Sequence, residues 1–208
     1  MWEVYVSSYI CYNIFVIKRR RLKMKKIGMF IEVINAGSIE LANRPHVVVG
    51  GTDIAIACRL RVGEASIPVT NDLVEGRLPE EVIMEATLSS PSINPVFLSE
   101  CGKINDIEMY LLSTDGLEYA SSLFYPGEMR ILEKKLGGGY IVIPSSIHEF
   151  LIIPDSDAIS ADNLAQIIKD VNGDKSLIKP EEILSYIPYH YADGVFETLA
   201  SYAKREGK

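Results

Sequence analysis

The strictest constraint on the fold is the alternation of apolar and polar residues over residues 53–62. Apolar side chains occupy every second position there, and Arg59 and Arg61 lie between them. Because successive side chains of a strand point to opposite faces, this segment predicts a half-buried strand in a sheet. A second short strand over residues 65–69 follows a turn at Gly63, so the two segments predict a hairpin.

The other elements are predicted from apolar periodicity bounded by glycine and proline. Strands are expected at residues 27–34, 46–49, 109–113, 140–143, 149–153 and around 188–191, with a hairpin-type turn at 114–116 leading to residues 117–124. Helices are expected at residues 79–89, where Pro91 and Pro95 prevent continuation, at 126–136, from Ser160 to Gly173, from Pro180 onward and at 195–205. Strands in hairpins interrupted by helices predict an α+β fold, with a mixed or antiparallel sheet and several packed helices.

The first 23 residues differ in character from the rest. An apolar, aromatic run over residues 2–17 is followed by basic residues 18–23. A secretory signal carries its positive charge before the apolar stretch, and a membrane anchor needs about 20 apolar residues, so the segment fits neither. Codons for residues 18–23 can contain a purine-rich bacterial ribosome-binding sequence at a suitable distance before Met24. We therefore expect Met24 to be the native start and residues 1–23 to be a non-native leader, which N-terminal sequencing tests.

Composition limits the domain organisation and the partners of the remaining chain. The 208 residues contain 21 basic and 28 acidic side chains, for a net charge of −7, and 48% are hydrophobic. This predicts one soluble α+β domain over residues 24–208, divisible into two lobes near residues 90–106. The acidic balance argues against nucleic acid as a partner, and against a membrane if Met24 is the start.

The cysteines predict a reducing compartment. Cys11, Cys58 and Cys101 are an odd number at wide spacings, which suits neither a disulfide framework nor a zinc site. We expect a cytoplasmic protein, with Cys58 as a small core residue.

The turn at residues 144–149 holds the residue types of a nucleophilic site. Ser145, Ser146, His148 and Glu149 are the candidate catalytic residues, with Ser146 or Ser145 as nucleophile and His148 as base. Their adjacency weakens this interpretation, because a working triad orients the base with a third group from elsewhere in the chain. The alternative is that the serines supply turn hydrogen bonds and His148 is a half-exposed polar residue.

Motifs for a metal or a cofactor fail on their details. Residues 170–181 resemble a calcium loop, but Lys175 stands where the turn requires glycine. The run at 137–139 follows a helix, whereas a phosphate site needs glycines before one, and Gly50 and Gly51 lead into a strand. We expect neither a metal nor a cofactor.

Several segments resemble an uncharacterised bacterial family that is known only as a domain of unknown function. The resemblance runs from about residue 43 to 193 and is strongest in the segments Tyr125-Pro126-Gly127 and Pro144-Ser145-Ser146-Ile147-His148-Glu149. Members of that family usually carry a longer helical N-terminal portion, so this chain resembles a truncated copy. The resemblance implies no activity. A second uncharacterised bacterial family shows a fainter similarity in the order of its elements.

Two classes of function therefore remain. The first is a non-catalytic binding protein for an unknown protein or small-molecule ligand, with Asp53, Asn71, Ser146 and His148 as candidate contacts. The second is a serine-type hydrolase that uses Ser146 or Ser145 with His148. The sequence leaves open whether the protein is an enzyme.

Overall fold

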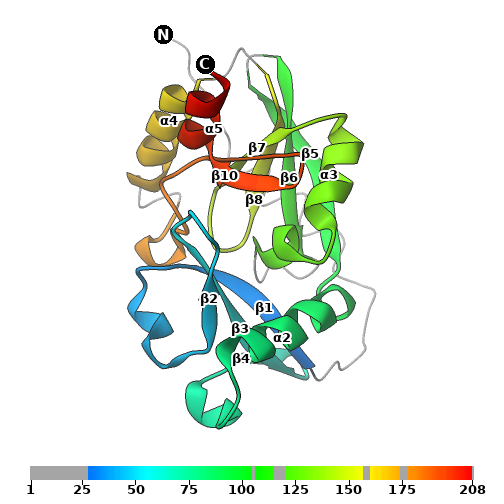
Figure 1. The fold of residues 1–208 in the computed structure, drawn as a ribbon, viewed down its shortest axis with the longest axis vertical. Helices are drawn as coiled ribbons and strands as arrows, with labels where there is room; N and C mark the ends of the chain where they lie inside the picture. The colour runs from blue at the N-terminus through cyan, green and yellow to red at the C-terminus, as the bar shows by residue number, and fades with distance from the viewer. Residues whose placement is uncertain (1–27, 105, 115–119, 157–159, 174–177, 208) are drawn as a thin grey trace.

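The computed structural model describes residues 28–208 except 105, 115–119, 157–159, 174–177 and 208. In this part the chain forms two antiparallel sheets and four α-helices, which confirms the predicted α+β class. Sheet A and helix α2 form the lower part of Figure 1, and sheet B with the other three helices forms the upper part. No helix among the described residues is long and apolar enough to cross a membrane.

Sheet A is built around the alternating segment at residues 53–62. Its central strand β3 (Ile54–Val62) pairs from Ile54 to Arg61 with β1 (Gly28–Asn35). The other side of β3 pairs first with β2 (His46–Val48) and then with β4 (Ala65–Pro68). These strands and the hairpin at Gly63 confirm the predictions for this region.

The face of β3 that carries Arg59 and Arg61 was expected to be exposed, but part of it is buried. Cys58 is buried, as expected, and packs with Val82 and Ala86 of the helix over residues 79–93. Ala55 and Ala57 on the opposite face are also buried, against Leu41 of the short 3-10 helix η1 (Ile39–Asn43). The expectation of a strand buried on one face only was therefore wrong for its first half. Small alanine side chains let η1 approach closely there.

Helix α2 (Pro79–Ile93) extends past its predicted end at residue 89 and includes Pro91. Since Pro91 lies in the last turn, its missing N–H costs the helix only one hydrogen bond. Two serines in the same turn attach the helix to β1. The Ser90 hydroxyl accepts the N–H of Ile31 at 2.8 Å, and the Ser89 hydroxyl donates to the carbonyl of Met29.

Sheet B has six antiparallel strands. Their order across the sheet is β10 (Val195–Thr198), β9 (Tyr189–Ala192), β7 (Tyr140–Pro144), β8 (Phe150–Pro154), β6 (Ile107–Thr114) and β5 (Val96–Ile104). The strands predicted at 109–113, 140–143, 149–153 and 188–191 are confirmed.

The hairpin partner of β6 differs from the prediction. It is β5, which sequence reasoning missed, and not residues 117–124. Residues 120–124 form the 3-10 helix η3 (Ala120–Phe124), while 115–119 lie outside the described residues.

Helices cover both faces of sheet B (Figure 1). Leu132 of α3 (Glu128–Leu136) packs with Val142 on one face, in a core cluster that also holds Val33 and Ile54 of sheet A. Leu164 of α4 (Ala161–Gly173) and Leu199 of α5 (Leu199–Glu206) pack on the other face. Apolar residues from both sheets thus share one core.

The C-terminal region corrects two helix predictions. Pro180 begins only the single turn of the 3-10 helix η4 (Pro180–Glu182), and residues 195–198 belong to β10 and not to the last helix. Asp193 and Gly194 both have positive φ, of 52° and 84°, and form a two-residue turn between β9 and β10. Thr198 then caps α5 by accepting the N–H of Ser201 at 3.1 Å.

Candidate functional site

The turn that joins β7 to β8 is held from both sides. The N–H of Ile147 donates to the carbonyl of Glu182 in η4 at 2.9 Å, and the carbonyl of Ile147 accepts from Ala120 of η3 at 2.7 Å. Within the turn, the N–H of Ser146 donates to the carbonyl of Glu149 at 3.3 Å. Backbone bonds to two neighbouring segments therefore fix the candidate residues in place.

The side chains of this turn contact one another, but not as a catalytic triad would. The Ser146 hydroxyl oxygen accepts the backbone N–H of His148 at 3.0 Å. The His148 ring faces Glu182 instead, with 3.8 Å between Nε2 and Oε1. The Ser145 hydroxyl donates to Oε1 of Glu149 at 3.3 Å. Both serines are thus used in bonds that shape the turn.

Electrostatics at the turn follow from burial. Burial raises the pKa of Glu149 above its ordinary value, while the hydrogen bond from Ser145 and the nearby His148 lower it. Of the candidate catalytic side chains, that of His148 is substantially exposed, at 38%.

Asp53 directly precedes β3 and connects the two sheets. Its Oδ1 accepts the hydroxyl of Tyr189 on β9, and its Oδ2 accepts the hydroxyl of Ser185 at 3.0 Å. Burial, followed by the hydrogen bond to Asp53, raises the pKa of Tyr189. Both carboxylate oxygens therefore have partners from the protein itself.

Asn71 lies in a third place. It is exposed and begins the 3-10 helix η2 (Asn71–Val74), which follows β4 of sheet A. The predicted ligand contacts are therefore split among the turn, the junction between the sheets and the outer part of sheet A.

Sequence reasoning missed a buried cluster around His190. This ring, 1% exposed, stacks on the ring of Tyr202 of α5 with 3.5 Å between centroids. His190 Nε2 and the Tyr202 hydroxyl both reach Oδ2 of Asp155, at 3.2 and 2.9 Å. The alternation of Tyr189, His190 and Tyr191 along a strand was the available signal, because it directs His190 to the face opposite the two tyrosines. An imidazole this buried holds α5 in position and is out of reach of a substrate.

A second cluster that sequence reasoning missed lies under η1. Oε1 of Glu32 on β1 accepts a hydrogen bond from the guanidinium of Arg44. Oε2 of the same carboxylate lies 3.5 Å from Nη1 of Arg59. Arg44 also donates to the carbonyl of Cys58 at 2.9 Å. Burial raises the pKa of Glu32, and the two arginines lower it. No local spacing reveals this cluster, since its members come from β1, β3 and the loop between η1 and β2.

Metal and thiol chemistry find little support in the described part of the chain. No group of three or more His, Cys, Asp or Glu side chains there is arranged to hold a metal ion. Residues 174–177 of the calcium-like segment lie outside it. Cys58 is buried and unpaired, and burial raises the pKa of its thiol to about 12, which agrees with the predicted core role.

The fold and these clusters define an α+β protein with two joined antiparallel sheets and a fixed polar turn at the end of β7. A family model, described as a family of unknown function (DUF5688), matches residues 75–193. This is more than half of the chain, so the protein belongs to that family. The matched residues include α2 and the turn at 144–149. Comparisons with curated proteins and with solved structures found no match.

Proposed function

We propose that this chain is a non-catalytic protein that binds a protein or small-molecule ligand. The observation that carries the proposal is the hydrogen bond from the backbone N–H of His148 to the Ser146 hydroxyl oxygen. A serine nucleophile needs the base nitrogen at its hydroxyl, and here the His148 ring faces Glu182. The turn is therefore built to keep its shape, which suits recognition of a partner.

The serine-type hydrolase stays as the second candidate because four residues of suitable types lie in one turn. Catalytic hydrogen bonds can be long in an enzyme without substrate, so the direction of the His148 ring calls for a chemical test. A fluorophosphonate probe supplies it, since such a probe labels an activated serine. We expect no labelling of the wild-type protein. Labelling that is lost in Ser146→Ala or in Ser145→Ala would overturn the non-catalytic proposal and identify the nucleophile.

We also propose that this protein is bacterial and lies in the cytoplasm. Support comes from Cys58, which is buried and forms no disulfide within the described part of the chain. Fractionation of native cells should recover the protein with cytoplasmic markers, and recovery with the membrane or the secreted fraction would contradict this setting.

A further inference from the structure

Helix α2 carries a second apolar row that the fold leaves uncovered. Met84 and Leu88 are 64% and 68% exposed. Each lies two residues from the buried Ala86, which is about 200° around the helix, so both point directly away from sheet A. Leu78 just before the helix and Leu73 in η2 are also exposed. Single exposed apolar residues are common on proteins, but four between residues 73 and 88 favour a contact area.

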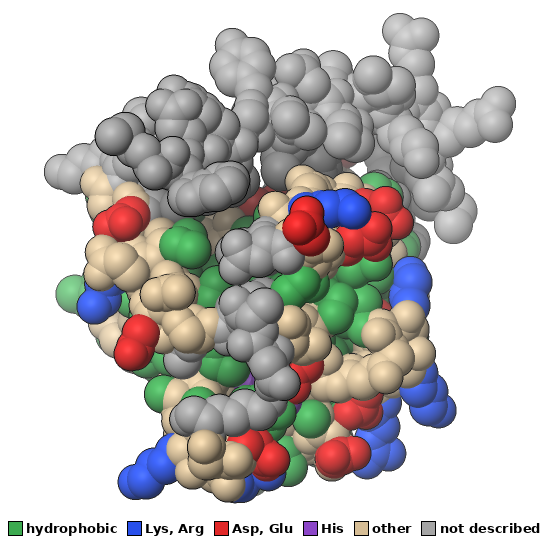
Figure 2. All heavy atoms as spheres, turned by 90° about the horizontal axis from the view of Figure 1, so that it is seen from above, with side chains coloured by type: hydrophobic (Ala, Val, Ile, Leu, Met, Phe, Trp, Pro, Cys, Tyr) green, Lys and Arg blue, Asp and Glu red, His purple; other side chains and the backbone are tan. Residues whose placement is uncertain are grey.

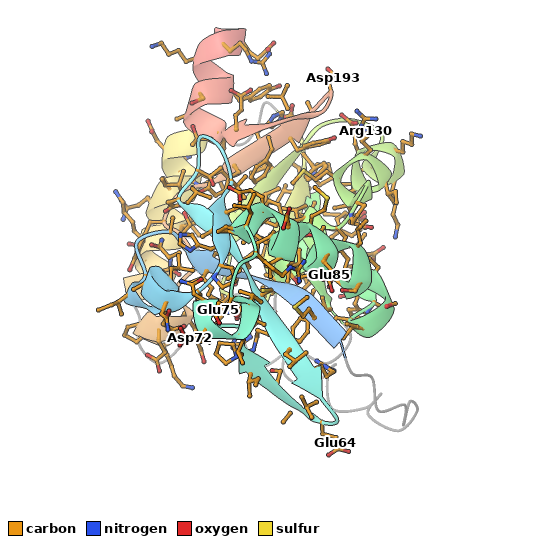
Figure 3. All side chains as sticks on the ribbon, turned by 60° about the horizontal axis from the view of Figure 1, so that its bottom comes forward. Glu64, Asp72, Glu75, Glu85, Arg130 and Asp193 are labelled. Atoms are coloured by element: carbon orange, nitrogen blue, oxygen red, sulfur yellow. The ribbon has the colours of Figure 1, made fainter. Side chains whose placement is uncertain are left out.

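The charges around this row have one sign. Asp72, Glu75, Glu80, Glu81 and Glu85 are all exposed or nearly so, and Arg77 is the one basic residue between residues 71 and 93. Its guanidinium is already held by Glu85 at 2.8 Å. Figure 3 shows Asp72, Glu75 and Glu85 on the side of the molecule turned toward the viewer. The end of the molecule farthest from α2 differs, since Lys and Arg side chains lie there among Asp and Glu in the described part (Figure 2).

These charges decide which partner fits. In a symmetric dimer formed through α2, the acidic residues of one copy would face those of the other, so a second copy is disfavoured. Nucleic acid and anionic lipid are repelled for the same reason. A helix with an apolar stripe bordered by lysine or arginine complements both the row and its border.

We propose that Leu73, Leu78, Glu81, Met84, Glu85 and Leu88, here called the α2 surface, bind a basic amphipathic helix of a partner protein. This inference rests on the proposed binding function and names the surface and the class of partner. Met84 and Leu88, one turn apart, contact the apolar stripe of the incoming helix. Glu81 pairs with its basic residues, while Glu85, which already holds Arg77, adds to the acidic border.

The test uses a synthetic helix of about 18 residues made of leucine and lysine, with a leucine and glutamate helix of the same apolar pattern as its counterpart. We expect the full chain to bind the lysine peptide with one-to-one stoichiometry by calorimetry. Met84→Ser combined with Leu88→Ser should weaken binding at least about tenfold. Glu81→Gln should weaken it less and reduce its dependence on salt. Because all these side chains are exposed, the variants should keep the wild-type circular dichroism spectrum.

Ile131→Ser is the matched control, since Ile131 is an exposed apolar residue on α3. It should bind like the wild type. Equal binding of the glutamate peptide, or undiminished binding by the double variant, would overturn the assignment of the α2 surface. If the wild type is a dimer and the double variant is a monomer, the α2 surface binds a second copy of this chain and not a basic helix, which would overturn the proposal. A natural partner held equally by the double variant would refute this surface but leave the binding function standing, whereas fluorophosphonate labelling would refute the function itself.

Discussion

His190 illustrates how one side chain couples the fold to pH. Its ring is buried between sheet B and Tyr202, and Asp155, Glu197 and Arg205 are the charged groups that act on it. Burial lowers the pKa of His190 below the ordinary value of 6.5, and Asp155 opposes this shift. The folded protein therefore holds this imidazole neutral at a pH where the unfolded chain would protonate it.

This imbalance predicts that stability falls on acidification. Below pH 6.5 and down to the lower pKa of folded His190, the unfolded state binds more protons, so the free energy of unfolding decreases as pH falls. In urea unfolding between about pH 7.5 and 5, we expect the free energy of unfolding of the wild type to decrease more than that of His190→Asn. The raised pKa values of Glu32 and Glu149 act in the opposite direction, but they contribute equally to both proteins. Equal slopes for the two proteins would contradict the prediction.

At the scale of elements, the end of α2 protects an edge of sheet A. Among the described strands β1 pairs only with β3, so its other side is an edge that could pair with another chain. Ser90 closes this edge by accepting the N–H of Ile31 while donating to the carbonyl of Ala86 in its own helix at 2.6 Å. The fully buried hydroxyl therefore completes both a strand and a helix.

Replacing this hydroxyl should destabilise the protein. In Ser90→Ala, the N–H of Ile31 is buried without an acceptor, which costs about 1–3 kcal/mol. Ser92→Ala is the matched control, because Ser92 is exposed in the same turn, and it should change stability by less than about 0.5 kcal/mol. Urea unfolding of both variants measures the difference. A Ser90→Ala protein as stable as Ser92→Ala would show that the edge is closed by other contacts.

Elements with an uninterrupted pattern could be predicted from the sequence, and interrupted ones could not. β3 and α3 have regular periods and were expected close to their observed bounds. β5 was missed because a bulge between Glu100 and Gly102 shifts its register and breaks the alternation. The C-terminal helix was expected to start at residue 195, but it starts at Leu199. Asp193 and Gly194 are a recognised hairpin signal that could have indicated the preceding strand.

The candidate site follows the same division. The local turn at 144–149 was found in the sequence, and its serines do form turn hydrogen bonds. The contacts of Asp53 could not be found, since its partners Ser185 and Tyr189 are 132 and 136 residues away along the chain. Such distant residues come into contact only when the two sheets pack together, and no local spacing in the sequence indicates that contact.

At the scale of the whole molecule, Asp53 ties sheet A to sheet B. Tyr189, completely buried, donates to it from β9, and Ser185 completes the contact. The core cluster with Val33, Ile54 and Leu132 lies between the same sheets. We propose that the two lobes form one cooperative domain over residues 24–208.

Removing one hydroxyl tests this link. In Tyr189→Phe, Asp53 loses a partner in a half-buried place, so we expect a loss of about 1–2 kcal/mol in the free energy of unfolding. Tyr186→Phe is the control, because Tyr186 is exposed, and it should have little effect. Fluorescence and circular dichroism should report a single coincident transition. Two separate transitions would contradict the single domain.

The placement of α2 shows how the region matched by the family model compares with the region that packs together. The matched residues begin at 75, after the last strand of sheet A, and end at 193, before β10 and α5. Yet the inner row of α2, with Val82 and Ala86, is buried against Ile31 and Cys58 of that sheet. A fragment cut at the ends of the matched region would bare this row to water. The stretch that the family model matches is thus shorter than the stretch whose side chains share a core in this structure.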